Sequence, residues 1–231
     1  MILIGLTGTI GSGKTFALNF FKSKKITVFS ADDEVKKIFK SKIIKDKIYK
    51  KFPESFSKKK INKNKLASIV FSDRKKLRSL EKVIHPLVKK KKNLFLNRNK
   101  NKKIIIMEIP IIFEQKSKKN YNYIIVMNVS RKIQYKRVMK RKNMTPELLK
   151  KILSNQISDK KIKYADFVIN NNGPKNKTKQ ALRKTLDKIM EFLKTGIFMF
   201  TASVLLYGIG NNRIKLEMDL GEGEFDGPTK N

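Results

Sequence analysis

Apolar runs of four to six residues recur along the chain, and polar or amphipathic stretches separate them. The runs lie at 2–6, 26–29, 104–108, 123–127 and 165–170. Short runs of this kind are typical of strands in a parallel sheet, because helices cover both faces of such a sheet. We therefore predict five parallel strands whose carboxyl ends meet at one edge.

The stretches between these runs have the spacing of amphipathic helices. It predicts helices over 14–23, 33–51, 65–72, 73–99, 131–141, 145–156 and 175–194. Pro53 ends the second of these, and Pro86 predicts a kink or a restart inside the fourth. Residues 54–64 are polar and rich in Lys, which indicates a loop. Strands that alternate with helices predict an α/β fold with a doubly wound sheet.

The turn after the first run carries the clearest chemical signal. The segment Gly8-Thr9-Ile10-Gly11-Ser12-Gly13-Lys14-Thr15 fits the phosphate-binding pattern G-x-x-x-x-G-K-[ST]. The glycines let successive N–H groups point at phosphate oxygens, and the next helix adds the partial positive charge of its N-terminus. We assign nucleotide phosphates to Gly8, Gly11, Ser12, Gly13, Lys14 and the backbone of Phe16, and Mg²⁺ to the hydroxyl of Thr15. The alternative is a glycine-rich turn without a ligand.

Two carboxylates follow predicted strands at the same edge of the sheet. Asp32 is the candidate general base; the alternative is that it caps the helix that begins near Asp33. Glu108 is placed either to approach Mg²⁺ through water or to be a satisfied residue at a strand end. His85, the only histidine, either helps to hold the acceptor substrate or is structural.

The formal net charge of +36 comes from 55 basic and 19 acidic residues. Such a charge often indicates a polyanionic partner. Here Lys dominates over Arg, and Lys, Ile and Asn are the residues that an A+T-rich coding sequence over-produces. We therefore expect no nucleic-acid partner. A polyanion-binding protein remains the alternative from a different class, and it would show steep salt dependence.

Residues 1–7 lack a basic region, so we expect no signal peptide and a cytoplasmic location. The uncharged run at 196–210 is shorter than the about 20 residues that a span requires, so no stable membrane insertion is expected. Residues 195–231 could form a membrane-touching or partner-binding helix, a packed terminal helix, or an unselected extension, which we favour. The sequence leaves the oligomeric state open.

Six motifs together resemble those of the dephospho-coenzyme A kinase family. They are Ile4–Lys14, Ser30-Ala31-Asp32, His85-Pro86-Leu87-Val88, Ile109-Pro110-Ile111-Ile112-Phe113-Glu114, Arg137 with Arg141 and Gln156, and Ala165–Asn170 with Gly173, which fits A-D-x-V-I-x-N-x-G. The resemblance covers about residues 1–194. It implies a three-layer P-loop kinase fold with a parallel five-stranded sheet. The implied regions are a core (1–32, 102–130 and 162–194), a helical substrate-binding region (about 33–101), a helical lid (about 131–161) and an extension at 195–231.

The resemblance implies ATP-dependent phosphorylation of the ribose 3′-hydroxyl of dephospho-coenzyme A, with Mg²⁺, giving coenzyme A and ADP. The implied catalytic residues are Lys14, Asp32 and Arg141. By the same resemblance Arg137 and Asn170 contact ATP, whereas His85 and Asp32 hold the acceptor. The alternative for both arginines is an exposed helix face. A nucleoside monophosphate kinase of the same architecture is the alternative enzyme.

Three positions depart from the family pattern. Ser30 stands where the family often has an Asp, which would leave Asp32 without an acidic neighbour and argues against a two-carboxylate mechanism. Phe16 replaces a usual hydroxyl residue, but its backbone N–H remains available to phosphate. Thr9 replaces a residue that is usually Gly or Ser.

Overall fold

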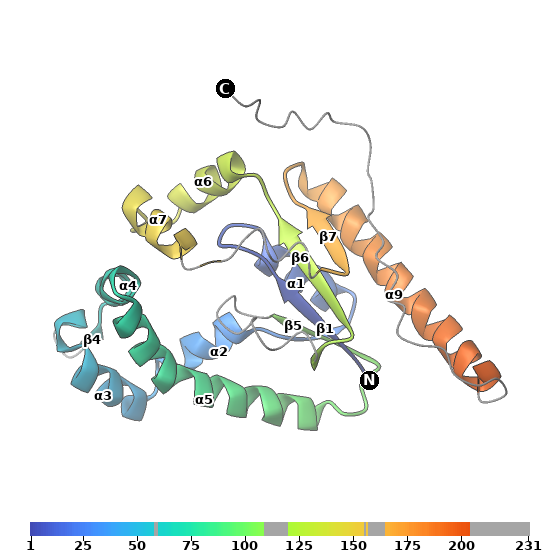
Figure 1. The fold of residues 1–231 in the computed structure, drawn as a ribbon, viewed down its shortest axis with the longest axis horizontal. Helices are drawn as coiled ribbons and strands as arrows, with labels where there is room; N and C mark the ends of the chain where they lie inside the picture. Colours follow the sequence, from blue (N-terminus) through green and yellow to red (C-terminus); the bar gives the residue numbers. More distant parts are fainter. Residues whose placement is uncertain (58–59, 109–119, 155, 157–164, 204–231) are drawn as a thin grey trace.

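The computed structural model describes residues 1–57, 60–108, 120–154, 156 and 165–203, and in this part the chain forms a parallel sheet between layers of helices (Figure 1). The sheet has the order β2-β5-β1-β6-β7. Its strands are β1 (Ile2–Thr7), β2 (Thr27–Phe29), β5 (Ile104–Glu108), β6 (Tyr123–Asn128) and β7 (Phe167–Asn170). All five predicted strands are confirmed, and all pairings between them are parallel.

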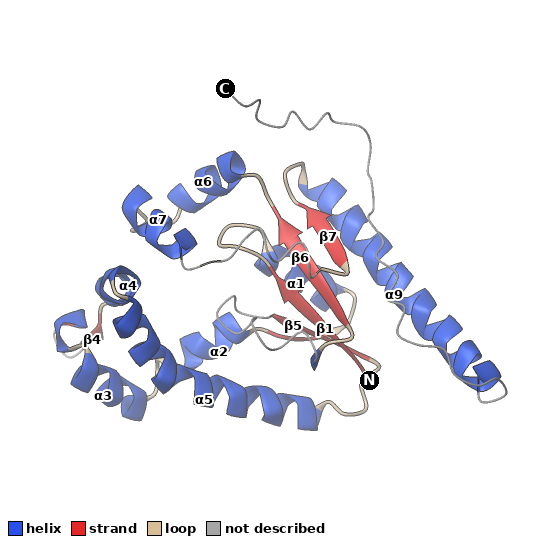
Figure 2. Ribbon diagram, in the orientation of Figure 1, coloured by secondary structure: helices blue, strands red, loops and turns tan. Residues whose placement is uncertain are grey.

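Helices cover both faces of this sheet, as Figure 2 shows. They are α1 (Lys14–Ser23), α2 (Ala31–Ile38), α3 (Lys42–Lys51), α4 (Lys63–Ser72), α5 (Arg74–Arg98), α6 (Arg131–Met139), α7 (Pro146–Ser154) and α9 (Lys175–Ser203). Since side chains alternate along a strand, Ile104 and Ile106 of β5 pack toward α1 and α9, whereas Ile105 and Met107 pack toward α2 and α5. Each face of the sheet therefore has its own apolar cluster.

Two predicted elements differ from the structure. The single helix expected over 33–51 is wrong, because α2 ends at Ile38 and α3 begins after Ser41, whose backbone is extended. The expected loop at 54–64 contains a 3₁₀ turn, Pro53–Ser55, and a short antiparallel pair, β3 (Phe56–Ser57) with β4 (Lys60–Ile61). The α3 helix and the β3–β4 pair lie at the end of the helical region that is far from the sheet (Figure 1).

One helix continues through a predicted restart, and another is longer than predicted. The α5 helix continues through Pro86 without a restart, because the buried Ile84 and Val88 anchor the helix on both sides of this exposed proline. The α9 helix continues past residue 194 to Ser203. Residues 204–231, the rest of the predicted extension, lie outside the described residues. None of the helices in the described part of the chain combines the length and the apolar character that a membrane span requires.

Helix α9 offers a test of how the helices pack against one face of the sheet. Leu182 is fully buried against the sheet, whereas Met190 on the same helix is 40% exposed. Leu182→Ala is expected to lower the free energy of unfolding by about 2–5 kcal/mol, because it leaves a cavity in a close-packed core. Met190→Ala is the matched control and is expected to cost less than about 1 kcal/mol. Urea unfolding measures both, and equal losses would contradict this packing.

Candidate active site

The phosphate loop joins β1 to α1 at the carboxyl edge of the sheet. Gly11 and Gly13 have φ angles of +78° and +102°, a region that residues with a side chain rarely adopt. A Cβ at Gly13 would also lie 2.1 Å from the amide nitrogen of Asn171. The pattern of glycines predicted from the sequence is therefore required by both the backbone angle and the space.

Lys14 and Thr15 begin α1, where the loop ends. The ammonium group of Lys14 donates a hydrogen bond to the carbonyl of Gly8 at 2.9 Å, so it lies over the start of the loop. Thr15 is exposed, which leaves its hydroxyl accessible. The structure thus places both predicted side chains beside the loop.

Ser30 connects the end of β2 to the end of β5. Its hydroxyl accepts a hydrogen bond from the N–H of Asp33 at 3.2 Å, and it donates one to Glu108 at 2.5 Å. Ser30 is therefore the N-cap of α2, and the alternative that Asp32 caps this helix is wrong. Asp32 lies in the first turn with its side chain exposed.

Glu108 is a buried carboxyl group at this edge, with 4% of its surface exposed. Burial raises its pKa above the ordinary value, because the charged form loses hydration. Asp32 raises this pKa further through its negative charge and through a hydrogen bond between the two carboxyl groups. The Ser30 hydroxyl and the charge of Lys14 act in the opposite direction.

The expectation that Ser30 leaves Asp32 without an acidic neighbour is wrong. The parallel register pairs Phe29 of β2 with Met107 of β5, so the residues that follow each of them are neighbours too. Glu108 thereby becomes the acidic neighbour of Asp32. Asp32, Glu108 and Lys14 form one charged group at the carboxyl edge of the sheet.

Two glutamines, one in α6 and one just after α7, bind the predicted lid to the loop. The side-chain amide of Gln134, in α6, donates to the hydroxyl of Thr9 at 2.8 Å and to the carbonyl of Ile10 at 2.7 Å. Gln156, just after α7, accepts a hydrogen bond from the N–H of Ile10 at 3.0 Å. Thr9, a departure from the family pattern, thus has a partner in the lid.

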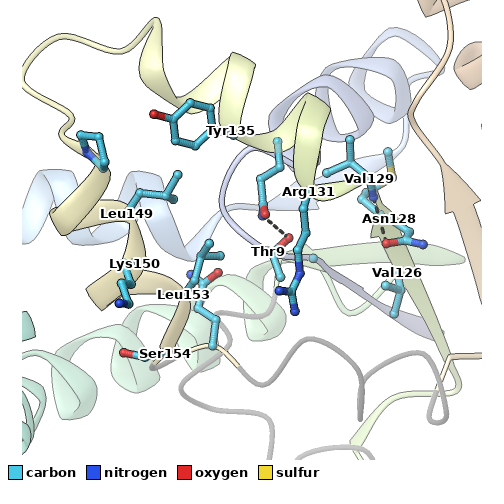
Figure 3. Close-up of a pocket in the computed structure, with 15 residues that line it drawn as sticks. Thr9, Val126, Asn128, Val129, Arg131, Tyr135, Leu149, Lys150, Leu153 and Ser154 are labelled. Atoms are coloured by element: carbon cyan, nitrogen blue, oxygen red, sulfur yellow. Dashed lines mark hydrogen bonds between the residues drawn. The ribbon is translucent and has the colours of Figure 1, made fainter. Parts of the chain in front are cut away.

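A cavity of about 650 Å³ lies between the loop, the end of β6 and the lid helices (Figure 3). Leu149 and Leu153 of α7 and Tyr135 of α6 give it an apolar wall, and Arg131 and Lys150 add positive charge. A space of this size accommodates a small-molecule ligand. The positive charges suit a phosphorylated one.

The structure separates the two predicted lid arginines. The guanidinium group of half-buried Arg137 donates to the backbone carbonyl of Asn171 at 2.9 Å, so the alternative of an exposed position is wrong for Arg137. Arg141 is exposed on the lid. Predicted contacts of both residues with ATP stay predictions.

Two neighbouring asparagines, Asn170 at the end of β7 and Asn171 just after it, make different contacts, and the predicted contact of Asn170 with ATP stays a prediction. Asn170, the predicted ATP contact, is exposed, and its side chain accepts from the N–H of Asn172 within the turn. Asn171 is 6% exposed, and its amide donates to the carbonyl of Ser12 in the phosphate loop at 2.8 Å. The asparagine of the A-D-x-V-I-x-N-x-G pattern falls at 171, which was the signal for this residue.

Other predicted residues are placed less completely. His85 is half-buried on α5, and burial lowers the pKa of its imidazole, which favours the neutral form at pH 7. Its role toward the acceptor stays a prediction. Residues 109–114 lie outside the described residues. Among the described residues, no three His, Cys, Asp or Glu side chains form a cluster that could hold a metal ion.

The comparisons with known proteins decide the family. A family model described as dephospho-CoA kinase matches residues 2–177. The chain belongs to the dephospho-CoA kinase family. The dephospho-CoA kinase of Bartonella quintana (strain Toulouse) is 39% identical over 194 residues, which are 83% of this chain and 100% of the relative. That of Rickettsia typhi (strain Wilmington) is 33% identical over 171 residues, 74% of this chain and 88% of the relative.

Solved structures give the same result. The Thermus thermophilus protein TT1252 has a TM-score of 0.66 at 27% identity and covers 81% of this chain and 97% of its own. The dephospho-CoA kinase from Campylobacter jejuni has a TM-score of 0.54 at 26% identity, with coverage of 81% and 96%. The predicted family and the three-layer P-loop kinase fold are confirmed. Dephospho-CoA kinases are phosphotransferases with an alcohol acceptor and catalyse the last step of coenzyme A biosynthesis.

The raised pKa of Glu108 predicts a pH-dependent penalty on stability. In the unfolded chain this carboxyl group ionises near the ordinary value of 4.5, and in the folded protein it ionises at higher pH. Between the two pKa values the unfolded chain holds fewer protons, so the free energy of unfolding falls as pH rises. Glu108→Gln has no proton to lose and still accepts from Ser30, so it is expected to gain stability relative to the parent as pH rises from about 4 to 8.

Asp33→Asn is the control with the opposite sign. The hydrogen bond from Lys36 lowers the pKa of Asp33, so its carboxylate stabilises the fold above the ordinary pKa. This variant is expected to lose stability relative to the parent over the same rise in pH. Urea unfolding at several pH values measures both, and a Glu108→Gln curve parallel to the parent's would contradict the buried carboxyl pair.

Proposed function

We propose that the phosphate loop, the carboxyl pair and the lid of this protein transfer the γ-phosphoryl group of ATP to the ribose 3′-hydroxyl of dephospho-CoA. One observation supports the proposal most directly: Lys14, Asp32 and Glu108 come together at the carboxyl edge of the sheet. Ligands of open α/β sheets bind at this edge. Phosphoryl transfer needs a phosphate cradle, positive charge and a base in one place.

In this mechanism the loop and Lys14 hold the phosphates of ATP. The N–H groups around Gly11 and Gly13 point at the phosphate oxygens, and the N-terminus of α1 adds its partial positive charge. The ammonium group of Lys14 leaves the carbonyl of Gly8 for the transferring phosphoryl group. Arg141, exposed on the lid, adds positive charge when the lid closes over the phosphates.

Asp32 is the proposed general base. Its exposed carboxylate accepts the proton of the 3′-hydroxyl, which makes the oxygen a better nucleophile toward phosphorus. Glu108, which itself accepts a hydrogen bond from Ser30, contacts this carboxylate from the sheet side. His85, on α5 of the helical region, is proposed to help hold the acceptor in its neutral form.

The residues present fit a magnesium ion that is bound mainly by substrate and water. The exposed hydroxyl of Thr15 would be the direct ligand from the protein, and Glu108 would approach through water. Mg²⁺ would neutralise negative charge on the phosphates. A cluster of three protein carboxylates is not needed, because Mg²⁺ keeps several waters in such sites. Since ATP is one substrate, we also propose a cytoplasmic location.

The substrate assay tests the proposal. The full-length protein with ATP and Mg²⁺ is expected to phosphorylate dephospho-CoA at least about a hundredfold more efficiently than AMP or CMP, because rejection of a misfitting acceptor is worth several kcal/mol. Product analysis by mass spectrometry measures all three. Transfer to AMP or CMP but not to dephospho-CoA would favour the nucleoside monophosphate kinase instead.

Two variants test the assigned roles. Lys14→Ala is expected to lower kcat by about a thousandfold, because it removes positive charge from the transferring group. Asp32→Asn is expected to lower kcat by about a hundredfold or more with little change in the KM of ATP, because only proton acceptance is lost. Asp33→Asn, the exposed neighbour, is the matched control. If Asp32→Asn and Asp33→Asn have the same kcat, Asp32 is not the base.

A further inference from the structure

Asn171 is a buried side chain at which three parts of the protein meet. Its amide nitrogen donates to the carbonyl of Ser12 in the phosphate loop at 2.8 Å. Its amide oxygen accepts from the hydroxyl of Thr178, in α9, at 2.9 Å. Its backbone carbonyl accepts from the lid residue Arg137 at 2.9 Å. The loop, the lid and α9 are thus linked through a single residue.

The two hydrogen bonds of the Asn171 side chain fix which way its amide points. The carbonyl of Ser12 can only accept, so the nitrogen end of the Asn171 amide has to face it. The oxygen end then faces Thr178, which has to donate. Thr178 is 1% exposed, so water does not replace its hydroxyl easily. The pair is therefore a directed relay from Thr178 through Asn171 to Ser12.

This relay acts on the peptide group that leads into Gly13. In a trans peptide the carbonyl and the N–H point in opposite directions. A donor that holds the carbonyl of Ser12 on the outer side of the loop therefore turns the N–H of Gly13 toward the inner side. The inner side is where phosphate oxygens bind in loops of this pattern.

The packing leaves little freedom for this arrangement. A Cβ on Gly13 would lie 2.1 Å from the amide nitrogen of Asn171, so the amide lies directly against the loop. Gln134 acts in the same way on an earlier peptide of the loop. Its amide donates to the carbonyl of Ile10 and so orients the N–H of Gly11. Two side-chain amides, from different elements, support the loop from outside.

We propose that Asn171 and Thr178 are positioning residues for ATP, and that they aim the N–H of Gly13 at a phosphate group. Neither residue touches the nucleotide in this proposal; both act through the loop. The inference rests on the proposed role of the loop in holding the phosphates of ATP. It predicts that removal of the Thr178 hydroxyl on α9 lowers the affinity for ATP and does not change the affinity for the acceptor.

The chain offers a matched control on the same helix. Thr178 and Thr185 both lie in α9 and are both buried, at 1% and 0% exposure. The hydroxyl of Thr185, however, has no hydrogen-bond partner within the described part of the chain. Replacement of either threonine by Val removes the hydroxyl and keeps nearly the same side-chain shape. Only Thr178→Val breaks the relay.

The experiment measures steady-state kinetics of the full-length protein and its variants against both substrates, together with thermal unfolding. Thr178→Val is expected to raise the KM of ATP about fivefold to tenfold, the worth of about one buried hydrogen bond. The KM of dephospho-CoA is expected to stay within about twofold, because the acceptor does not contact this peptide. Thr178→Ser, which keeps the hydroxyl, is expected to restore the KM of ATP. Thr185→Val is expected to match the parent.

Each contrary result has a defined meaning. An unchanged KM of ATP in Thr178→Val, or equal values in Thr178→Val and Thr178→Ser, would overturn the relay. So would an equal rise in the KM of both substrates. If Thr178→Val is too unstable to assay, Asn171→Asp takes its place: it keeps the size but loses the donor to Ser12, and a parent-like KM of ATP would overturn the proposal. A parent protein that does not turn over dephospho-CoA would instead contradict the proposed function.

Discussion

The phosphate loop depends on a constraint of the planar peptide. Its N–H groups can face inward toward an anion only if the carbonyls of the same peptides face outward. Those outward carbonyls need donors, because a buried carbonyl without a partner is costly. In this protein Gln134 supplies a donor to Ile10 and Asn171 supplies one to Ser12, from two different flanks of the loop. The rest of the site is arranged around a loop that is held from outside.

On the other side of the loop, the carboxyl pair follows from the parallel register. Because β2 pairs directly with β5, the residue after Phe29 comes beside the last residue of β5. Ser30 uses this position twice, as the cap of α2 and as a donor to Glu108. The two carboxyl groups of Asp32 and Glu108 thus come together beside the positive charge of Lys14.

Much of the fold could be predicted from the sequence, because strand character and helix periodicity are local properties. The apolar run at 104–108 and the glycine pattern at 8–15 each specify their own structure. The pairing of Asp32 with Glu108 could not be predicted, since it depends on the order of the strands. The contact of Asn171 with the phosphate loop was not predicted for a related reason: one step along a strand moves a side chain from one face to the other, and Asn171 is buried where Asn170 is exposed. The contact of Gln134 with the loop joins residues 124 positions apart, and no local pattern indicates it.

The helical region and the predicted lid are attached to the core in different ways. The helical region shares one continuous apolar cluster with the sheet, which extends from Ile105 through Ile84 to Leu66. Val138, Leu149 and Ile152, buried residues of α6 and α7 in the predicted lid, belong to neither cluster of the sheet. A part of a protein with few apolar contacts to the core has low local stability and opens most readily. Hydrogen exchange should therefore divide the molecule unequally, with the helical region exchanging together with the sheet and the lid exchanging on its own.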